Sequence, residues 1–182
     1  MVTANQSEPT FLPDLATLNA LPEPAFVQAI APLFEGAPRF LARLATVRPF
    51  ATSHVLFERA RAIAHEMPDE EQVELVNAHP RLGAPPGTVS SLSYREQGYN
   101  SATADQDRAR LTARFDRLNE AYEERFGFRY CVYVAGRPRA ALLPEMKAAL
   151  ARRRPEELER AVNAVVDIAR ARYTQLAADA SS

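Results

Sequence analysis

Apolar side chains in this sequence recur with the period of an α-helix, and this pattern restricts the fold more than any other feature. The clearest stripe has steps of four, three, four and four residues: Leu111, Phe115, Leu118, Tyr122 and Phe126. Such spacing places the five side chains on one face of a helix. Gly127 follows the stripe, at a position where glycine commonly ends a helix. The sequence therefore predicts a helix that runs from Asp105 to this glycine.

Less regular stripes predict four more helices, over residues 54–66, 70–78, 139–153 and 156–177. Ser53 precedes the first of these and is expected to cap it. Asp69 and Gln72 have the spacing of a capping box at the start of the second. Pro155 stands where proline is favoured, at the first position of the last helix.

Only residues 128–135 have the composition of a β-strand, with Tyr130, Val132, Tyr133 and Val134 close together. No second stretch shows a strand pattern with which this one could pair. We therefore expect an all-α, single-domain helical bundle with one extended, unpaired segment near 128–135. The domain is expected to span residues 1–182, with an ordered core over about 11–177 and frayed termini. Residues 80–103 are rich in Pro, Gly and Ser and are expected to form a long, functional loop.

Charge and hydropathy exclude several classes of function. The 22 basic and 23 acidic residues leave a net charge of −1, so no binding to nucleic acid by phosphate neutralisation is expected. The polar start of the chain has no signal-peptide pattern, and the longest apolar run, Tyr130–Ala135, is too short to cross a membrane. We therefore expect a cytoplasmic protein without a membrane partner.

The sequence also gives no indication of a cofactor or a metal. Cys131 is the one cysteine, so no internal disulfide or cysteine-based zinc site can form. His54 and His65 would lie about 16 Å apart on their helix, at 1.5 Å per residue, which is too far for both to bind one metal ion. The six glycines do not have the spacing of a nucleotide-binding loop. We expect neither a metal nor a cofactor.

His79 is the first candidate for chemistry. Pro80 disfavours the helical conformation at His79, so the helix over 70–78 should end there, at the mouth of the long loop. The negative end of the helix dipole should then raise the pKa of His79. A single histidine at a helix end is nonetheless more often a capping or surface residue.

Glu96 and Gln97 form a second candidate, because a carboxylate beside an amide could bind a planar, urea-like group. Arg137 follows the extended segment and Arg172 lies late in the last predicted helix; either could bind a small carboxylate. Taken singly, each of these residues is more often an ordinary surface residue.

The order of five motifs resembles the OHCU decarboxylases, a family named for the substrate 2-oxo-4-hydroxy-4-carboxy-5-ureidoimidazoline. Residues 79–83 are similar to its His-Pro-x-Leu/Ile-Ala/Gly motif, and residues 93–97 to its Ser-x-x-Glu-Gln motif. The other similar stretches are residues 118–128, 134–137 and 168–172. The resemblance runs from about Leu18 to Leu176.

This resemblance implies an all-α fold, a homodimer and a cofactor-free carboxy-lyase that converts OHCU to (S)-allantoin and CO₂ in urate degradation. The implied partner is a small, anionic ureido-imidazoline substrate. His79 and Glu96 carry over as the acid/base pair, and three residues carry over as pocket residues: Pro80, Ser93 and Gln97. Arg172 carries over as an anion-binding residue. Arg137 is added to the substrate-binding set from its position alone.

Two departures from the family pattern concern the loop. Arg81 and Gly83 stand where many members have Asp and Ala, and the loop between His79 and Ser93 is short. Two other functions therefore stay open: a related decarboxylase or lyase acting on another ureido acid, and an inactive helical binding module. A binding module should expose an apolar groove, whereas an enzyme should enclose a small polar pocket.

Overall fold

The computed structural model describes residues 12–97 and 105–179. Within these ranges it contains helices and no strand, which confirms the predicted all-α class. The α-helices are α1 Leu15–Ala20, α2 Glu23–Ile30, α3 Pro38–Thr46, α4 Ser53–Glu66, α5 Asp69–Ala78, α6 Ser91–Glu96, α7 Asp105–Phe126, α8 Arg139–Ala149 and α9 Arg154–Asp179. Two 3-10 helices, η1 Ala31–Phe34 and η2 Pro86–Thr88, lie between them.

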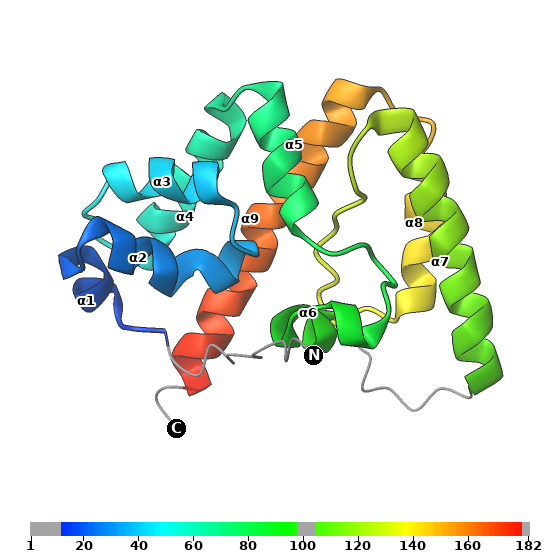
Figure 1. The fold of residues 1–182 in the computed structure, drawn as a ribbon, viewed down its shortest axis with the longest axis horizontal. Helices are drawn as coiled ribbons and strands as arrows, with labels where there is room; N and C mark the ends of the chain where they lie inside the picture. Colours follow the sequence, from blue (N-terminus) through cyan, green and yellow to red (C-terminus); the bar gives the residue numbers. More distant parts are fainter. Residues whose placement is uncertain (1–11, 98–104, 180–182) are drawn as a thin grey trace, which may run out of the picture.

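Helix α9 runs through the middle of the molecule and organises the fold (Figure 1). Helices α4 and α5 and the short η1 pack directly against it, while α7 and α8 pack against each other. In Figure 1, α1 to α4 lie on one side of α9, and α7 and α8 lie on the other. Buried apolar side chains from all these helices form one hydrophobic cluster. Among the described helices, none is both long enough and apolar enough to cross a membrane.

The predicted helix ends are close to the observed ones, but two predicted caps are wrong. Thr52, not Ser53, caps α4, since its hydroxyl accepts a hydrogen bond from the Val55 N–H at 3.2 Å. At α5 the N-cap is Pro68, without a side-chain cap, and the capping box of Asp69 does not form. The Asp69 carboxylate instead accepts hydrogen bonds from both terminal nitrogens of Arg154, at 2.9 and 2.8 Å. Asp69 therefore binds a side chain distant in sequence rather than the backbone N–H groups at the start of its own helix.

The extended segment over 128–134 is present and has no strand partner in the described structure. Arginine side chains supply hydrogen bonds that a neighbouring strand would otherwise provide. Arg160 donates to the Cys131 carbonyl at 2.8 Å, and Arg137 donates to those of Tyr133 and Val134 at 2.8 and 3.0 Å. Because backbone carbonyls removed from bulk water need donors, these guanidinium groups stabilise a non-helical segment that has no strand beside it.

The loop after α5 is more ordered than expected, since its described part contains η2 and α6. Gly83 shows why this loop needs a glycine: its φ is +84°, and an added Cβ would lie 2.8 Å from the Phe115 Cβ. Alanine would therefore be both strained and crowded here. The packing of Gly83 against α7 explains why glycine, and not alanine, stands at this position in this chain.

Candidate active site

A cavity of about 190 Å³ lies where the end of α5, α6, the extended segment and α9 meet. Its small size suits a metabolite rather than a larger ligand. Six of the seven residues predicted for the site line it: His79, Pro80, Ser93, Glu96, Gln97 and Arg172. Residues 130–136, from the extended segment and the turn that follows it, also line the cavity. Three segments far apart in the sequence therefore meet at one pocket.

His79 ends α5 in extended conformation, with φ −75° and ψ 142°, as predicted from the following proline. Its side chain is buried, and neither ring nitrogen makes a well-formed hydrogen bond, although a weak one to the Leu75 backbone opposes the lowering of its pKa. Burial and, to a smaller extent, the charge of Arg172 together lower the pKa of His79 to about 4, against the opposing effect of Glu35. The predicted rise in this pKa is therefore wrong. Desolvation shifts a pKa by several units, more than a helix dipole does.

The lowered pKa of His79 predicts a loss of stability in mild acid. Above pH 6.5 the imidazole is neutral in both the folded and the unfolded chain. Between pH 6.5 and about 4, only the unfolded chain binds the proton, so the free energy of unfolding falls as the pH falls. The expected loss is on the order of 3 kcal/mol. Urea unfolding of the native protein and of a His79→Gln variant at pH 7.5, 6 and 5 should show that the free energy of unfolding falls more steeply with pH for the native protein than for the variant; parallel curves would contradict this.

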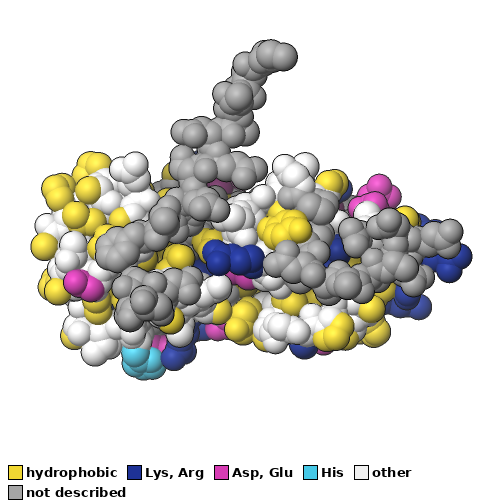
Figure 2. All heavy atoms as spheres, turned by 90° about the horizontal axis from the view of Figure 1, so that it is seen from below, with side chains coloured by type: hydrophobic (Ala, Val, Ile, Leu, Met, Phe, Trp, Pro, Cys, Tyr) yellow, Lys and Arg dark blue, Asp and Glu magenta, His cyan; other side chains and the backbone are white. Residues whose placement is uncertain are grey.

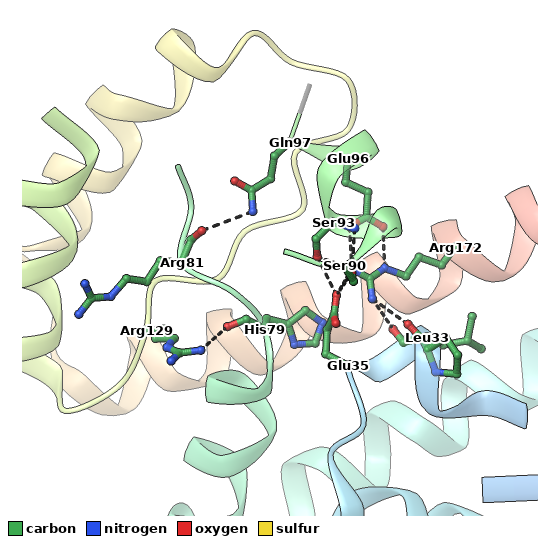
Figure 3. Close-up of polar contacts among 11 residues, drawn as sticks. Leu33, Glu35, His79, Arg81, Ser90, Ser93, Glu96, Gln97, Arg129 and Arg172 are labelled. Carbon is green, nitrogen blue, oxygen red and sulfur yellow. Dashed lines mark hydrogen bonds and ion pairs between the residues drawn. The ribbon is translucent and has the colours of Figure 1, made fainter. Parts of the chain in front are cut away.

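Arg172, on α9, is fully buried and is the centre of the polar network beside the cavity (Figure 3). Its Nε and Nη2 bind the two oxygens of Glu96 at 2.7 and 2.8 Å. Nη2 also donates to Glu35 at 2.8 Å and to Ser93 at 3.0 Å, and Nη1 donates to the backbone carbonyls of Pro32 and Leu33 at 2.9 and 3.5 Å. A guanidinium has five N–H groups. The protein itself therefore provides acceptors for all the donors of Arg172.

Glu35 does not line the cavity, but it belongs to the Arg172 network beside it, and the sequence analysis missed it. It follows η1 in left-handed conformation, with φ 52°, and one of its oxygens accepts from Ser90, Ser93 and Arg172 at 2.8, 2.7 and 2.8 Å. Burial alone would raise the pKa of Glu35, but the Arg172 charge and the two serine hydroxyls together hold it below its ordinary value. The available signal was a charged residue directly after the wholly apolar run 29–34.

The ionic groups around the cavity carry a net negative charge. Two carboxylates, Glu35 and Glu96, share one guanidinium, Arg172, while burial keeps His79 neutral above a pH of about 4. Figure 3 shows the His79 ring beside Glu35, with Arg172 on the other side of that carboxylate. The histidine is therefore a neutral imidazole in the resting site, with one N–H to donate and one nitrogen to accept.

Gln97 holds the loop that follows His79. Its Oε1 accepts from the Gly83 N–H at 2.8 Å, and its Nε2 donates to the Arg81 carbonyl at 3.4 Å. Asn119 of α7 donates to the Leu82 carbonyl at 2.9 Å, and Arg81 pairs with Glu123 of the same helix. The loop that forms one edge of the cavity is therefore fixed to α7 and to α6.

Arg137 is not among the residues that line the cavity. Its guanidinium turns to Glu145 of α8 at 2.6 Å and to the carbonyls of Tyr133 and Val134. The structure thus places Arg137 behind the turn that ends the extended segment. In this position Arg137 holds the backbone of two residues that line the cavity, Tyr133 and Val134, and does not itself face a bound molecule.

Neither a metal nor a reactive thiol is indicated by the residues around the cavity. Across residues 12–97 and 105–179, no three His, Cys, Asp or Glu side chains are grouped so as to hold a metal ion. Cys131 lines the cavity, but burial raises the pKa of its thiol to about 12. It therefore stays a thiol near neutral pH, which makes it a poor nucleophile.

Comparison with known proteins identifies related sequences over most of the chain. Residues 19–174 match the family model described as OHCU decarboxylase. A 2-oxo-4-hydroxy-4-carboxy-5-ureidoimidazoline decarboxylase of Haloferax volcanii is 29% identical over 161 residues, which cover 88% of this chain and 94% of that protein. The uric acid degradation bifunctional protein PucL of Bacillus subtilis is also 29% identical, over 87% of this chain but only 32% of its own length.

Solved structures show the same fold. The crystal structure of an OHCU decarboxylase in the presence of (S)-allantoin aligns with a TM-score of 0.62 and 25% identity, and the match covers 78% of this chain and 92% of that one. An (S)-allantoin synthase aligns with the same TM-score at 18% identity, which supports the fold alone.

Proposed function

The chain belongs to the OHCU decarboxylase family, and from that premise we propose that its cavity binds 2-oxo-4-hydroxy-4-carboxy-5-ureidoimidazoline and converts it to (S)-allantoin and CO₂. The protein is thus a carboxy-lyase of urate degradation. The observation that carries the assignment is His79: a buried, neutral imidazole in a small cavity, whose ring nitrogens make no well-formed hydrogen bond within the protein. Buried polar atoms of this kind are costly unless a ligand supplies their partners.

The chemistry needs a proton carrier and a fixed substrate ring. When the bond to the carboxyl carbon breaks, its electron pair forms a double bond to the neighbouring ring carbon, and the electrons of the ring C=N bond move onto nitrogen, which takes up a proton. The hydroxyl proton then leaves as C=O forms, and the neighbouring carbon is protonated on one face. The ring itself therefore accepts the electrons.

His79 suits the transfer of the hydroxyl proton to carbon. In its resting neutral form it can accept that proton, and an anionic substrate beside it would raise its pKa and stabilise the imidazolium. Glu96 is proposed as its acid/base partner, and Pro80, Ser93 and Gln97 as the residues that shape the substrate pocket, because all four line the same cavity.

We assign Arg172 a double role. Its N–H groups fix Glu35 and Glu96 beside the cavity, and its positive charge reduces the repulsion that these two carboxylates exert on an anionic substrate. Arg137 supports the turn of the extended segment from outside the cavity. The substrate specificity then depends mainly on the hydrogen-bonding groups of the cavity wall.

An inactive binding module fits the surface less well. Among the described residues, the large hydrophobic side chains that are exposed are Val47 and Tyr133. On the face shown in Figure 2, the apolar side chains that are described lie scattered among polar ones. Neither observation reveals the broad apolar groove that a helical adaptor would use.

The direct test is decarboxylation of freshly generated OHCU. The protein should accelerate the loss of the OHCU absorbance and give (S)-allantoin, recognised by its circular dichroism, whereas spontaneous decay gives the racemate. Loss of OHCU at the spontaneous rate, or racemic product at saturating enzyme, would contradict the assignment. Turnover of another ureido acid instead would favour the related decarboxylase.

We further propose a homodimer in the cytoplasm, as the family resemblance implies. Sedimentation at micromolar concentration should give about twice the monomer mass. A monomer with full activity would remove the dimer from the proposal without affecting the chemistry.

A further inference from the structure

The backbone of His79 is held by a side chain that does not line the cavity. Arg129, on the extended segment, donates from Nη1 to the carbonyls of Asn77 and His79 at 2.8 and 3.0 Å (Figure 3). In return, the Asn77 side-chain oxygen accepts from the Arg129 backbone N–H at 2.9 Å. These three hydrogen bonds, which we call the Arg129 clasp, join two segments that are about fifty residues apart in sequence.

The clasp satisfies the end of α5. The last carbonyls of a helix have no partners within it and carry the negative end of its dipole. No basic residue lies in the last turn of α5, and Pro80 has no N–H to continue the hydrogen bonding. A cation that arrives from the extended segment therefore caps this helix.

A backbone anchor matters for His79 because its ring is only weakly held. A functional histidine is commonly oriented by a hydrogen bond from one ring nitrogen to a carboxylate or carbonyl. Here neither ring nitrogen makes a well-formed hydrogen bond within the protein, and its contact with the Leu75 backbone is weak. The position of the imidazole thus depends on packing and on its backbone, whose carbonyl is bound by Arg129.

The clasp also connects His79 to a second part of the cavity lining. Arg129 is followed directly by Tyr130 and Cys131, which line the cavity together with His79. Fixing Arg129 to the end of α5 therefore fixes these two residues relative to the backbone of His79. We propose that Arg129 is a positioning residue for decarboxylation, which acts through the backbone of His79 and the placement of the lining residues that follow Arg129. This inference rests on the function proposed above.

The test is Arg129→Met, with Arg129→Lys as the conservative variant. The methionine variant should lose about 10–100-fold in kcat with a KM within a few-fold of native, because displacement of a reacting group slows the chemistry more than binding. Lysine has three N–H donors and should restore most of the rate. The control is Arg48→Met, since Arg48 caps α3 in the same way, by donating to the Ala45 and Leu21 carbonyls, but is not among the residues lining the cavity.

A second readout does not require turnover. NMR titration of the His79 ring should show a pKa raised toward 6.5 in Arg129→Met, as the loosened imidazole gains solvent, and a native pKa in Arg48→Met. A folded Arg129→Met protein with native kcat and native His79 titration would overturn the inference. If that variant does not fold, Arg129→Gln, which stays polar but loses the charge, decides by the same two measurements. An inactive native protein would refute the proposed function, while the titration would still test the clasp.

Discussion

Replacement of His79 by asparagine is expected to reduce the kcat for (S)-allantoin formation by about 10²–10⁴-fold, the usual contribution of general acid–base catalysis. The fold should survive, because the ring makes no well-formed hydrogen bond that the substitution would break. The melting temperature is expected to stay within about 4 °C of native, which corresponds to about 1 kcal/mol for a chain of this size. Steady-state kinetics and thermal unfolding of the same preparation provide both measurements.

His65→Asn is the matched control for this substitution. His65 is exposed, and its ring contacts the side chain of Asn163 at 3.0 Å, so its replacement removes a structural hydrogen bond away from the cavity. The control should retain native kcat. An active His79→Asn protein would end the proposed mechanism and make Glu96 the next candidate for the central base.

Arg172→Met is expected to have the largest effect on stability. It leaves Glu35 and Glu96, both mostly buried, without their shared cation. Breaking a buried ion pair from one side costs about 3–5 kcal/mol, which lowers the melting temperature by roughly 6–20 °C in a chain of this size. Activity should be lost as well, even when it is measured well below the unfolding transition.

Two further variants separate the roles of Arg172. Arg170→Met removes an exposed arginine of the same helix and should change neither stability nor activity by much. Adding Glu35→Gln and Glu96→Gln to Arg172→Met should recover part of the stability, because no buried charge is then uncompensated, but not the activity. If Arg172→Met raises only KM, with an unchanged melting temperature, Arg172 binds substrate without supporting the network.

The helices of this protein could be predicted from the sequence because helix formation depends on local interactions. The stripe from Leu111 to Phe126 and the glycine that follows it predicted α7 almost to its ends. Gly127 has the expected positive φ of 78°, and its N–H bonds the Glu123 carbonyl at 2.8 Å. Likewise, Pro80 by itself predicted that α5 ends at His79.

Part of the site could also be predicted, because its residues are concentrated in short motifs. His79, Pro80, Ser93, Glu96 and Gln97 lie within two neighbouring stretches, and all of them line the cavity. Arg137 was placed only by its position after the extended segment, and its guanidinium turns away to Glu145. The residues chosen because they belong to a motif therefore line the cavity, whereas the residue chosen only for its position in the sequence does not.

What only the tertiary structure decided is the environment of each charge. Glu35 and Arg172 are 137 residues apart, and no local pattern indicates that they share a buried ion pair. The pKa of His79 shows the same limit: from the sequence, a helix dipole should raise it, but burial lowers it to about 4. Secondary structure depends on neighbours along the chain, whereas desolvation and ion pairing depend on which distant segments pack together.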